Sequence, residues 1–150
     1  MLITVNDKTV EALPLIMRKE FAKQIVDGTK KFEVRIASPH YDKLLLDMTR
    51  YPQWRKESFP WGETPWREEL PEVAHFHNYS NSFTLDVEIL EYRFVVPIPE
   101  TEAELHEWGC HEFDEMINDF KKLSPEEAKK TNVNFFYVLE LGEVINSKGL

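Results

Sequence analysis

Cysteine is nearly absent from this chain of 150 residues, and Cys110 alone cannot form an internal disulfide. A reducing compartment is therefore expected. No run of about 18 apolar residues occurs, so the sequence predicts no transmembrane helix. The N-terminal stretch MLITVNDKTVEALPL lacks a basic segment followed by an apolar one, which is the pattern of a signal peptide. We accordingly expect a cytoplasmic protein.

Positive charge is also scarce. The net charge is −9, which opposes strong, sequence-blind binding to duplex DNA because such binding neutralises phosphates. The charge is uneven, however: residues 1–56 carry 11 Lys and Arg against 7 Asp and Glu, whereas residues 57–150 carry 7 against 20. A local anion-binding patch in the first third is compatible with this distribution, and a broad basic surface is not.

Apolar residues make up 42% of the chain and aromatic residues 13%, as in a globular protein with a real core. Helical spacing from Met17 ends at Asp27-Gly28, and alternation predicts strands over 31–36 and 83–96. A helix is expected over 113–120, another after Ser124, and an apolar strand over 134–141. Residues 48–72 show no clear periodicity and form an aromatic-rich insertion. We predict one α+β domain over 1–150, with a small, mostly antiparallel sheet or β-barrel.

A cluster of charges follows the first glycine turn. Gly28-Thr29-Lys30-Lys31-Phe32-Glu33-Val34-Arg35 reads G-x-K-x-x-E-x-R. Lys30 and Arg35 suit an anionic or carbonyl group, because Arg presents a planar fork to phosphate or carboxylate. Glu33 would orient Arg35 on the same strand face. The competing interpretation is a solvated ion-pair cluster on an exposed strand, which is common and weak.

This motif resembles that of the ASCH superfamily, a PUA-like β-barrel group. Supporting segments occur along the chain in the order that this family has: an apolar strand and helix before the motif, an aliphatic strand in the middle, Glu107-Trp108-Gly109, and FFYVLEL at the end. The resemblance implies a cleft that binds RNA, a nucleotide or a modified nucleoside. Some members are amidohydrolases acting on N(4)-acetylcytidine, and one group has been reported as a ribonuclease. Their catalytic lysine and glutamate correspond to Lys30 and Glu107, whereas their threonine position holds Glu33, which disfavours that mechanism.

The same resemblance implies ligand-binding roles for a larger set of residues: Gly28, Lys30, Glu33, Arg35, His77, Tyr79, Ser80 and Trp108. The aromatic segment 48–79 has arginines between its rings, a combination that suits single-stranded nucleic acid. Large aromatics also bury well, so a satellite core is the alternative interpretation of this segment.

Metal and nucleophile patterns are weak. His75 and His77 share a strand face, but no third ligand is evident at a suitable spacing. His106 and Cys110 would share a helix face, but no residue is evident to orient the base of such a pair. No glycine-rich phosphate loop is present. We therefore predict no metal and no cofactor.

Three functions remain open. The first is a binding module for RNA or a nucleotide-like small molecule, and the second is a small hydrolase using Lys30 and Glu107. The third is a protein-interaction domain that docks a partner through its tryptophan-rich insertion. A membrane partner is not expected, and the sequence does not set the oligomeric state.

Overall fold

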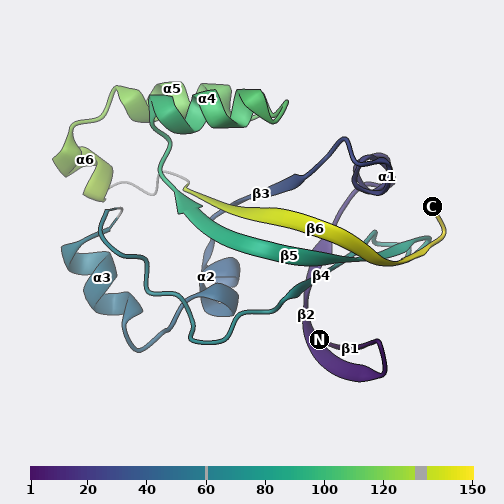
Figure 1. The fold of residues 1–150 in the computed structure, drawn as a ribbon. Coiled ribbons are helices and arrows are strands. Elements are labelled where there is room, and N and C mark those ends of the chain that lie inside the picture. Colours follow the sequence, from purple (N-terminus) through teal and green to yellow (C-terminus); the bar gives the residue numbers. More distant parts are fainter. Residues whose placement is uncertain (60, 131–134) are drawn as a thin grey trace. The chain divides into compact units, whose positions relative to one another are not determined.

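The computed structural model describes residues 1–59, 61–130 and 135–150, with the backbone alone for 128–130. Strands and helices alternate irregularly along the chain (Figure 1). The strands are β1 (Leu2–Val5), β2 (Lys8–Ile16), β3 (Phe32–Ile36), β4 (Val73–His77), β5 (Thr84–Val95) and β6 (Phe136–Lys148). The helices are α1 (Lys19–Asp27), α2 (Pro39–Leu45), α3 (Tyr51–Glu57), α4 (Pro99–Glu107), α5 (Asp114–Lys121) and α6 (Pro125–Lys130).

The strands form one mixed sheet in the order β1-β2-β4-β5-β6-β3. β1 pairs with β2, and β4 with β5, in antiparallel fashion, whereas β2 and β4 run parallel. A parallel pair needs a long crossover, and here α1, β3, α2 and α3 lie between the two strands in the sequence. The predicted α+β class is confirmed, but the predicted barrel is not: β1 and β3 end the strand order, and within the described ranges the sheet does not close.

The chain divides into two compact units. The first comprises residues 1–33, 71–92 and 139–150, and the second residues 34–70 and 93–138. Buried apolar residues of the first unit come from β2, α1, β4, β5, β6 and the segments before α1 and β5: Ala12, Leu13, Leu15, Met17, Ala22, Ile25, Val73, Ala74, Phe76, Phe83, Leu85, Val87, Ile89, Leu139 and Leu141. α1 is amphipathic and places Ala22 and Ile25 in this core.

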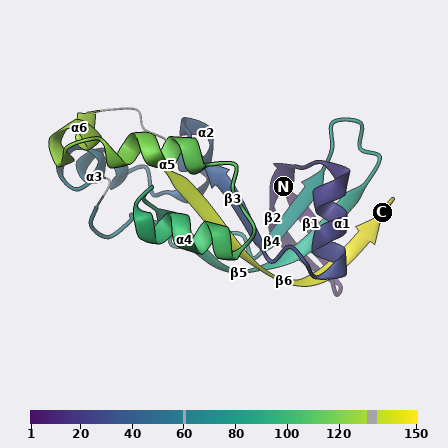
Figure 2. The same cartoon turned by 90° about the horizontal axis from the view of Figure 1, so that it is seen from above.

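The second unit has a core of its own. Leu105 from α4, Ile117 from α5 and Phe136 from β6 form a buried cluster, with Phe113 and Met116 packed against it. α4 and α5 contact each other and form a hairpin (Figure 2). Since Glu102 pairs with Lys121 and His106 with Asp114, the two helices are antiparallel.

Several local predictions are confirmed. α1 ends at Gly28, whose φ of +85° is the left-handed conformation that glycine adopts without strain. The stripe expected over 113–120 is the buried face of α5, and Ser124 caps α6: its hydroxyl accepts from Glu127 N, and its own N–H donates to Glu127. The strand expected over 134–141 is β6, although residue 134 lies outside the described ranges.

Three of the described helices, α2, α3 and α4, were not predicted. α3 lies inside the segment expected to lack regular structure; it has seven residues and buries only Trp54, so it carries no apolar stripe. α4 begins at Pro99, shortly after the strand expected over 83–96, and proline commonly breaks a strand. Proline also suits the first position of a helix, because its missing N–H would have no helical partner there. No helix in the ranges described is long and apolar enough to cross a membrane.

Candidate functional site

The lysine of the motif is held beside a buried carboxylate in the first unit. After the Gly28 turn, Lys30 N–H donates to Gln24 O at 3.0 Å, which fixes the backbone before β3 begins. Lys30 Nζ lies 3.5 Å from Glu33 Oε2, and these side chains are 24% and 9% exposed. The ammonium also lies 5.8 Å from the centre of the Phe21 ring. This pair is mostly shielded from water, which contradicts the interpretation of a solvated ion pair.

The burial of Glu33 also corrects the predicted faces of β3. Alternation placed Phe32, Val34 and Ile36 inside and Glu33 outside, yet Glu33 is buried and the other residues are only partly buried. A buried carboxylate is costly unless a partner compensates its lost hydration, and Lys30 is such a partner.

Arg35 belongs to the second unit, where its Nη1 donates to the Tyr41 hydroxyl at 3.3 Å. Tyr41 lies in the first turn of α2, a helix capped by Ser38. The prediction that Glu33 orients Arg35 joins residues of different units, as does the prediction that Glu107 faces Lys30; both stay predictions.

The other predicted site residues have contrasting surroundings. Glu107 is the exposed last residue of α4, and the next residue, Trp108, packs against the cluster of Leu105, Ile117 and Phe136. Trp108 therefore has a role in packing, whatever else it contacts. Its proposed contact with a ligand stays a prediction.

His77, Tyr79 and Ser80 lie at the end of β4 and in the connection to β5. His77 Nδ1 lies 3.2 Å from Asn78 O, and Tyr79 is 88% exposed. His75, which lies on β4 like His77, has its Nδ1 atom 2.6 Å from Asp86 Oδ1. An exposed tyrosine can stack on a base, but no described part of the chain encloses Tyr79, so these residues do not form a pocket by themselves.

A pocket does exist in the second unit. It has a volume of about 310 Å³ and is lined by residues from α2, α3, β5 and the segments next to them: Ala37, Ser38, Pro39, Asp42, Tyr51, Trp54, Arg55, Phe59, Phe94 and Phe135. Its rings touch one another mainly edge to face: the Trp54 ring lies 5.1 Å from Phe59 and 5.4 Å from Phe94. Trp54 and Phe59 are 7% and 4% exposed, so the alternative of a satellite core is confirmed for them.

Asp42 gives the pocket a polar group. Its Oδ1 accepts a hydrogen bond from the Tyr137 hydroxyl at 2.5 Å, and its Oδ2 accepts one from the Tyr51 hydroxyl at 3.4 Å. Burial raises the pKa of Asp42 above its ordinary value, while these hydrogen bonds and the Arg55 charge act against that rise. Burial and the nearby carboxylate raise the pKa of both phenols, so both keep their protons at neutral pH and donate.

Arg55 supplies the positive charge at the pocket. Its guanidinium lies 3.6 Å from the centre of the Phe59 ring, a cation–π contact that fixes the plane of the group. The N–H groups at its edge remain suited to an anion. The aromatic segment was recognised in the sequence, whereas Asp42, Phe94 and Phe135 were not. The only signal for Asp42 would have been pairing with Tyr137, far away in the sequence.

The comparisons with known proteins support the resemblance to the ASCH superfamily. The family model for the ASCH domain matches residues 15–141, most of the chain. No curated protein and no solved structure gives a significant match. The matched range contains the G-x-K-x-x-E-x-R motif and every residue that lines the pocket. The chain belongs to the ASCH domain family.

Proposed function

We propose that this protein binds RNA, at a single-stranded end, or a nucleotide-like small molecule, and that a base of this ligand occupies the pocket of the second unit. The observation that carries the proposal is the lining of that pocket. Aromatic rings surround a space of about 310 Å³, which is within the range of small-molecule sites. The half-buried carboxylate of Asp42 and the guanidinium of Arg55 reach the same space.

The chemistry of the lining suits a nucleotide. A base is a flat ring whose edge carries amino or ring N–H donors, and single-stranded nucleic acid is commonly held by stacking on aromatic side chains. Asp42 accepts hydrogen bonds only, so it would select such a donor edge. Arg55 would contact a phosphate. The acidic net charge of the whole chain fits a small or single-stranded ligand better than a duplex.

The family motif would bind through the first unit by itself, where Lys30 would hold an anionic or carbonyl group with Glu33 beside it. Contacts with a ligand are proposed separately for Arg35 and Glu107, which belong to the second unit. Binding without chemistry is favoured over the hydrolase function, because the Lys30 ammonium is already paired with Glu33. A paired lysine is a weaker general base or nucleophile than a free one.

The test is an amide NMR titration of the labelled protein with cytidine, N(4)-acetylcytidine, CMP and a short single-stranded RNA at low salt. We expect chemical-shift changes for the amides of residues 37–59 and of residue 94. Arg55→Gln should weaken the binding of CMP more than the binding of cytidine. Lys56→Gln is the matched control, because Lys56 is the exposed neighbour on the same helix.

The possible outcomes separate the functions. If no ligand moves any amide, the nucleotide and RNA proposals are both wrong. If shifts occur but Arg55→Gln and Lys56→Gln behave alike, the base does not sit in this pocket. A product signal growing over hours would instead establish the hydrolase, and Lys30→Ala should then abolish turnover while leaving binding intact.

A further inference from the structure

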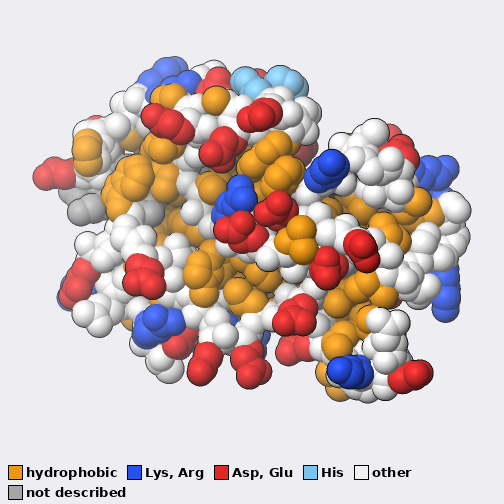
Figure 3. Space-filling model, viewed as in Figure 1, with side chains coloured by type: hydrophobic (Ala, Val, Ile, Leu, Met, Phe, Trp, Pro, Cys, Tyr) orange, Lys and Arg blue, Asp and Glu red, His pale blue; other side chains and the backbone are white. Residues whose placement is uncertain are grey.

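Three side chains that bind metals in other proteins meet at the joint between α4 and α5, away from the lining of the pocket. His106, His111 and Asp114 each place one ligand atom within 4.8 Å of the other two. Figure 3 shows histidine side chains at the surface over these helices. No metal was predicted from the sequence, and His111 and Asp114 were not recognised there as possible ligands.

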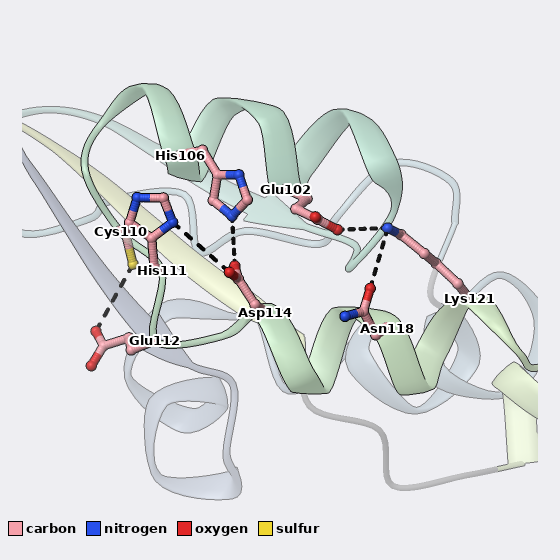
Figure 4. A network of polar contacts seen from close by, with 8 residues as sticks. All are labelled: Glu102, His106, Cys110, His111, Glu112, Asp114, Asn118 and Lys121. Carbon is pink, nitrogen blue, oxygen red and sulfur yellow. Dashed lines mark hydrogen bonds and ion pairs between the residues drawn. The ribbon is translucent and has the colours of Figure 1, made fainter.

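The two imidazoles approach opposite oxygens of one carboxylate. His106 Nε2 lies 2.6 Å from Asp114 Oδ1, and His111 Nδ1 lies 3.8 Å from Asp114 Oδ2 (Figure 4). The ring centres are 4.4 Å apart, with 32° between the ring planes. A hydrogen bond from His106 accounts for the first contact. It does not account for a second imidazole directed at the other oxygen of the carboxylate.

The backbone holds these residues in place. His106 is in the last turn of α4, Asp114 is the first residue of α5, and Gly109 turns the chain between them with a φ of +78°. At the other end of the hairpin, Lys121 Nζ lies 2.6 Å from Glu102 Oε2. The buried Leu105 and Ile117 pack the two helices together, so the ligand atoms sit on a supported frame.

We propose that His106, His111 and Asp114 form a site for a divalent transition metal, with Zn²⁺ as the ion of choice. Imidazole and carboxylate are common zinc ligands, with metal–ligand distances of about 2.0–2.2 Å. Two ligand atoms on a tetrahedral ion are then roughly 3.3–3.6 Å apart. The 2.6 Å contact between His106 and Asp114 must lengthen by about 0.7–1.0 Å to reach this separation. The three ligand atoms lie within 4.8 Å of one another, so any longer separation must shorten by at most about 1.5 Å, which side-chain rotation can supply.

Three protein ligands leave one coordination position open for water or a bound group, unlike a closed structural site. Cys110 is not part of the proposed set: its Sγ lies 3.9 Å from Glu112 Oε1, and it packs against the cluster of Leu105, Ile117 and Phe136. The carbonyl end of α4 favours a cation beside His106. The site is independent of the proposed nucleotide pocket.

The test is a Zn²⁺ titration of the untagged full chain by calorimetry, repeated with amide NMR. We expect one zinc per chain, with shifts centred on residues 106–114. His111→Ala and Asp114→Asn should each weaken zinc binding by more than tenfold, since the loss of an outer-shell partner alone costs about 10–100-fold. His111 is 64% exposed, so its removal leaves the fold intact.

Two controls make the result specific. His40→Ala removes an exposed histidine elsewhere, and Cys110→Ser removes the nearby thiol; both should leave the affinity unchanged. The proposal is overturned if the wild-type chain takes up no zinc, or if His111→Ala binds it as tightly as the wild type. It is equally overturned if the affinity depends on Cys110 or His40 instead of His111.

Discussion

The phenol of Tyr137 supports the Asp42 carboxylate, and removing it tests the electrostatics of the pocket. Tyr137 is 1% exposed and its hydroxyl donates to Asp42 at 2.5 Å, whereas the Tyr51 hydroxyl is more distant, at 3.4 Å. Among the effects that lower the pKa of Asp42, the Tyr137 hydrogen bond is the largest. Tyr137→Phe keeps the buried ring and removes only this donor.

The loss of stability expected for Tyr137→Phe follows from the charge of the Asp42 carboxylate. A hydrogen bond to a charged group contributes about 1.5–3 kcal/mol. Tyr137→Phe should therefore lower the free energy of unfolding by about that amount at neutral pH. For a chain of this length about 1 kcal/mol shifts the melting temperature by about 2–4 °C, so we expect a fall of roughly 3–12 °C.

The effect must also depend on pH with a definite sign. Without the phenol, the pKa of Asp42 in the folded protein rises further above its value of 3.8 in the unfolded chain. A carboxyl whose pKa is raised on folding contributes stability below its unfolded pKa, and this stability is lost as pH rises through the folded pKa. The cost of Tyr137→Phe is therefore largest at neutral pH and shrinks as pH falls toward 3.8.

Urea denaturation at several pH values measures this cost, with the m-value as a check that unfolding stays two-state. A double-mutant cycle with Asp42→Asn isolates the coupling, because the charge is then absent. The reasoning fails if Tyr137→Phe costs the same at pH 4 and pH 7. It also fails if the cost is unchanged in the Asp42→Asn background.

Three further changes have definite expected costs, each measured by urea denaturation. Lys30→Ala leaves the buried Glu33 carboxylate without its cationic partner and should lower the free energy of unfolding by about 1–3 kcal/mol. Lys31→Ala, at an exposed position, should change it by no more than about 0.5 kcal/mol, and equal effects of the two variants would refute the buried pair. Gly28→Ala should cost about 1–2 kcal/mol from backbone strain alone, since nothing lies within 4 Å of the added methyl group, and no loss would contradict the left-handed turn. Ile117→Ala opens a cavity among fully buried side chains and should cost about 2–5 kcal/mol, so a cost typical of a surface residue would argue against the α4–α5 packing.

The sequence predicted the helix ends that depend on interactions between neighbouring residues. Asp27-Gly28 marks the end of α1, and Ser124 with Glu127 marks the start of α6, because both act on neighbouring backbone groups. α4 was missed because Pro99 has two meanings, breaker or first helical residue. The closure of the sheet was predicted wrongly because strand order depends on pairing between distant segments, which alternation in one strand does not encode.

The candidate site likewise contains residues that the sequence indicates and residues that it does not. The motif at Lys30 and Glu33 could be found in the sequence, but the burial of Glu33 opposed the alternation of its own strand. Asp42 stood in no recognisable pattern. It becomes part of the pocket only because Tyr137, 95 positions away, folds onto it. Long-range contact of this kind leaves no trace in a single sequence.

The two ends of the segment from Asp47 to Trp66 contact each other. Asp47 N–H donates to Pro65 O at 2.8 Å, and a β-bridge joins Leu46 to Trp66. A loop whose ends already touch can change length at little entropic cost, because closure entropy grows only with the logarithm of its length. This loop carries Tyr51, Trp54 and Arg55, whereas Asp42 lies outside it. The lining of the pocket can therefore change, in evolution or by loop exchange, while the Asp42 carboxylate and the sheet stay unchanged.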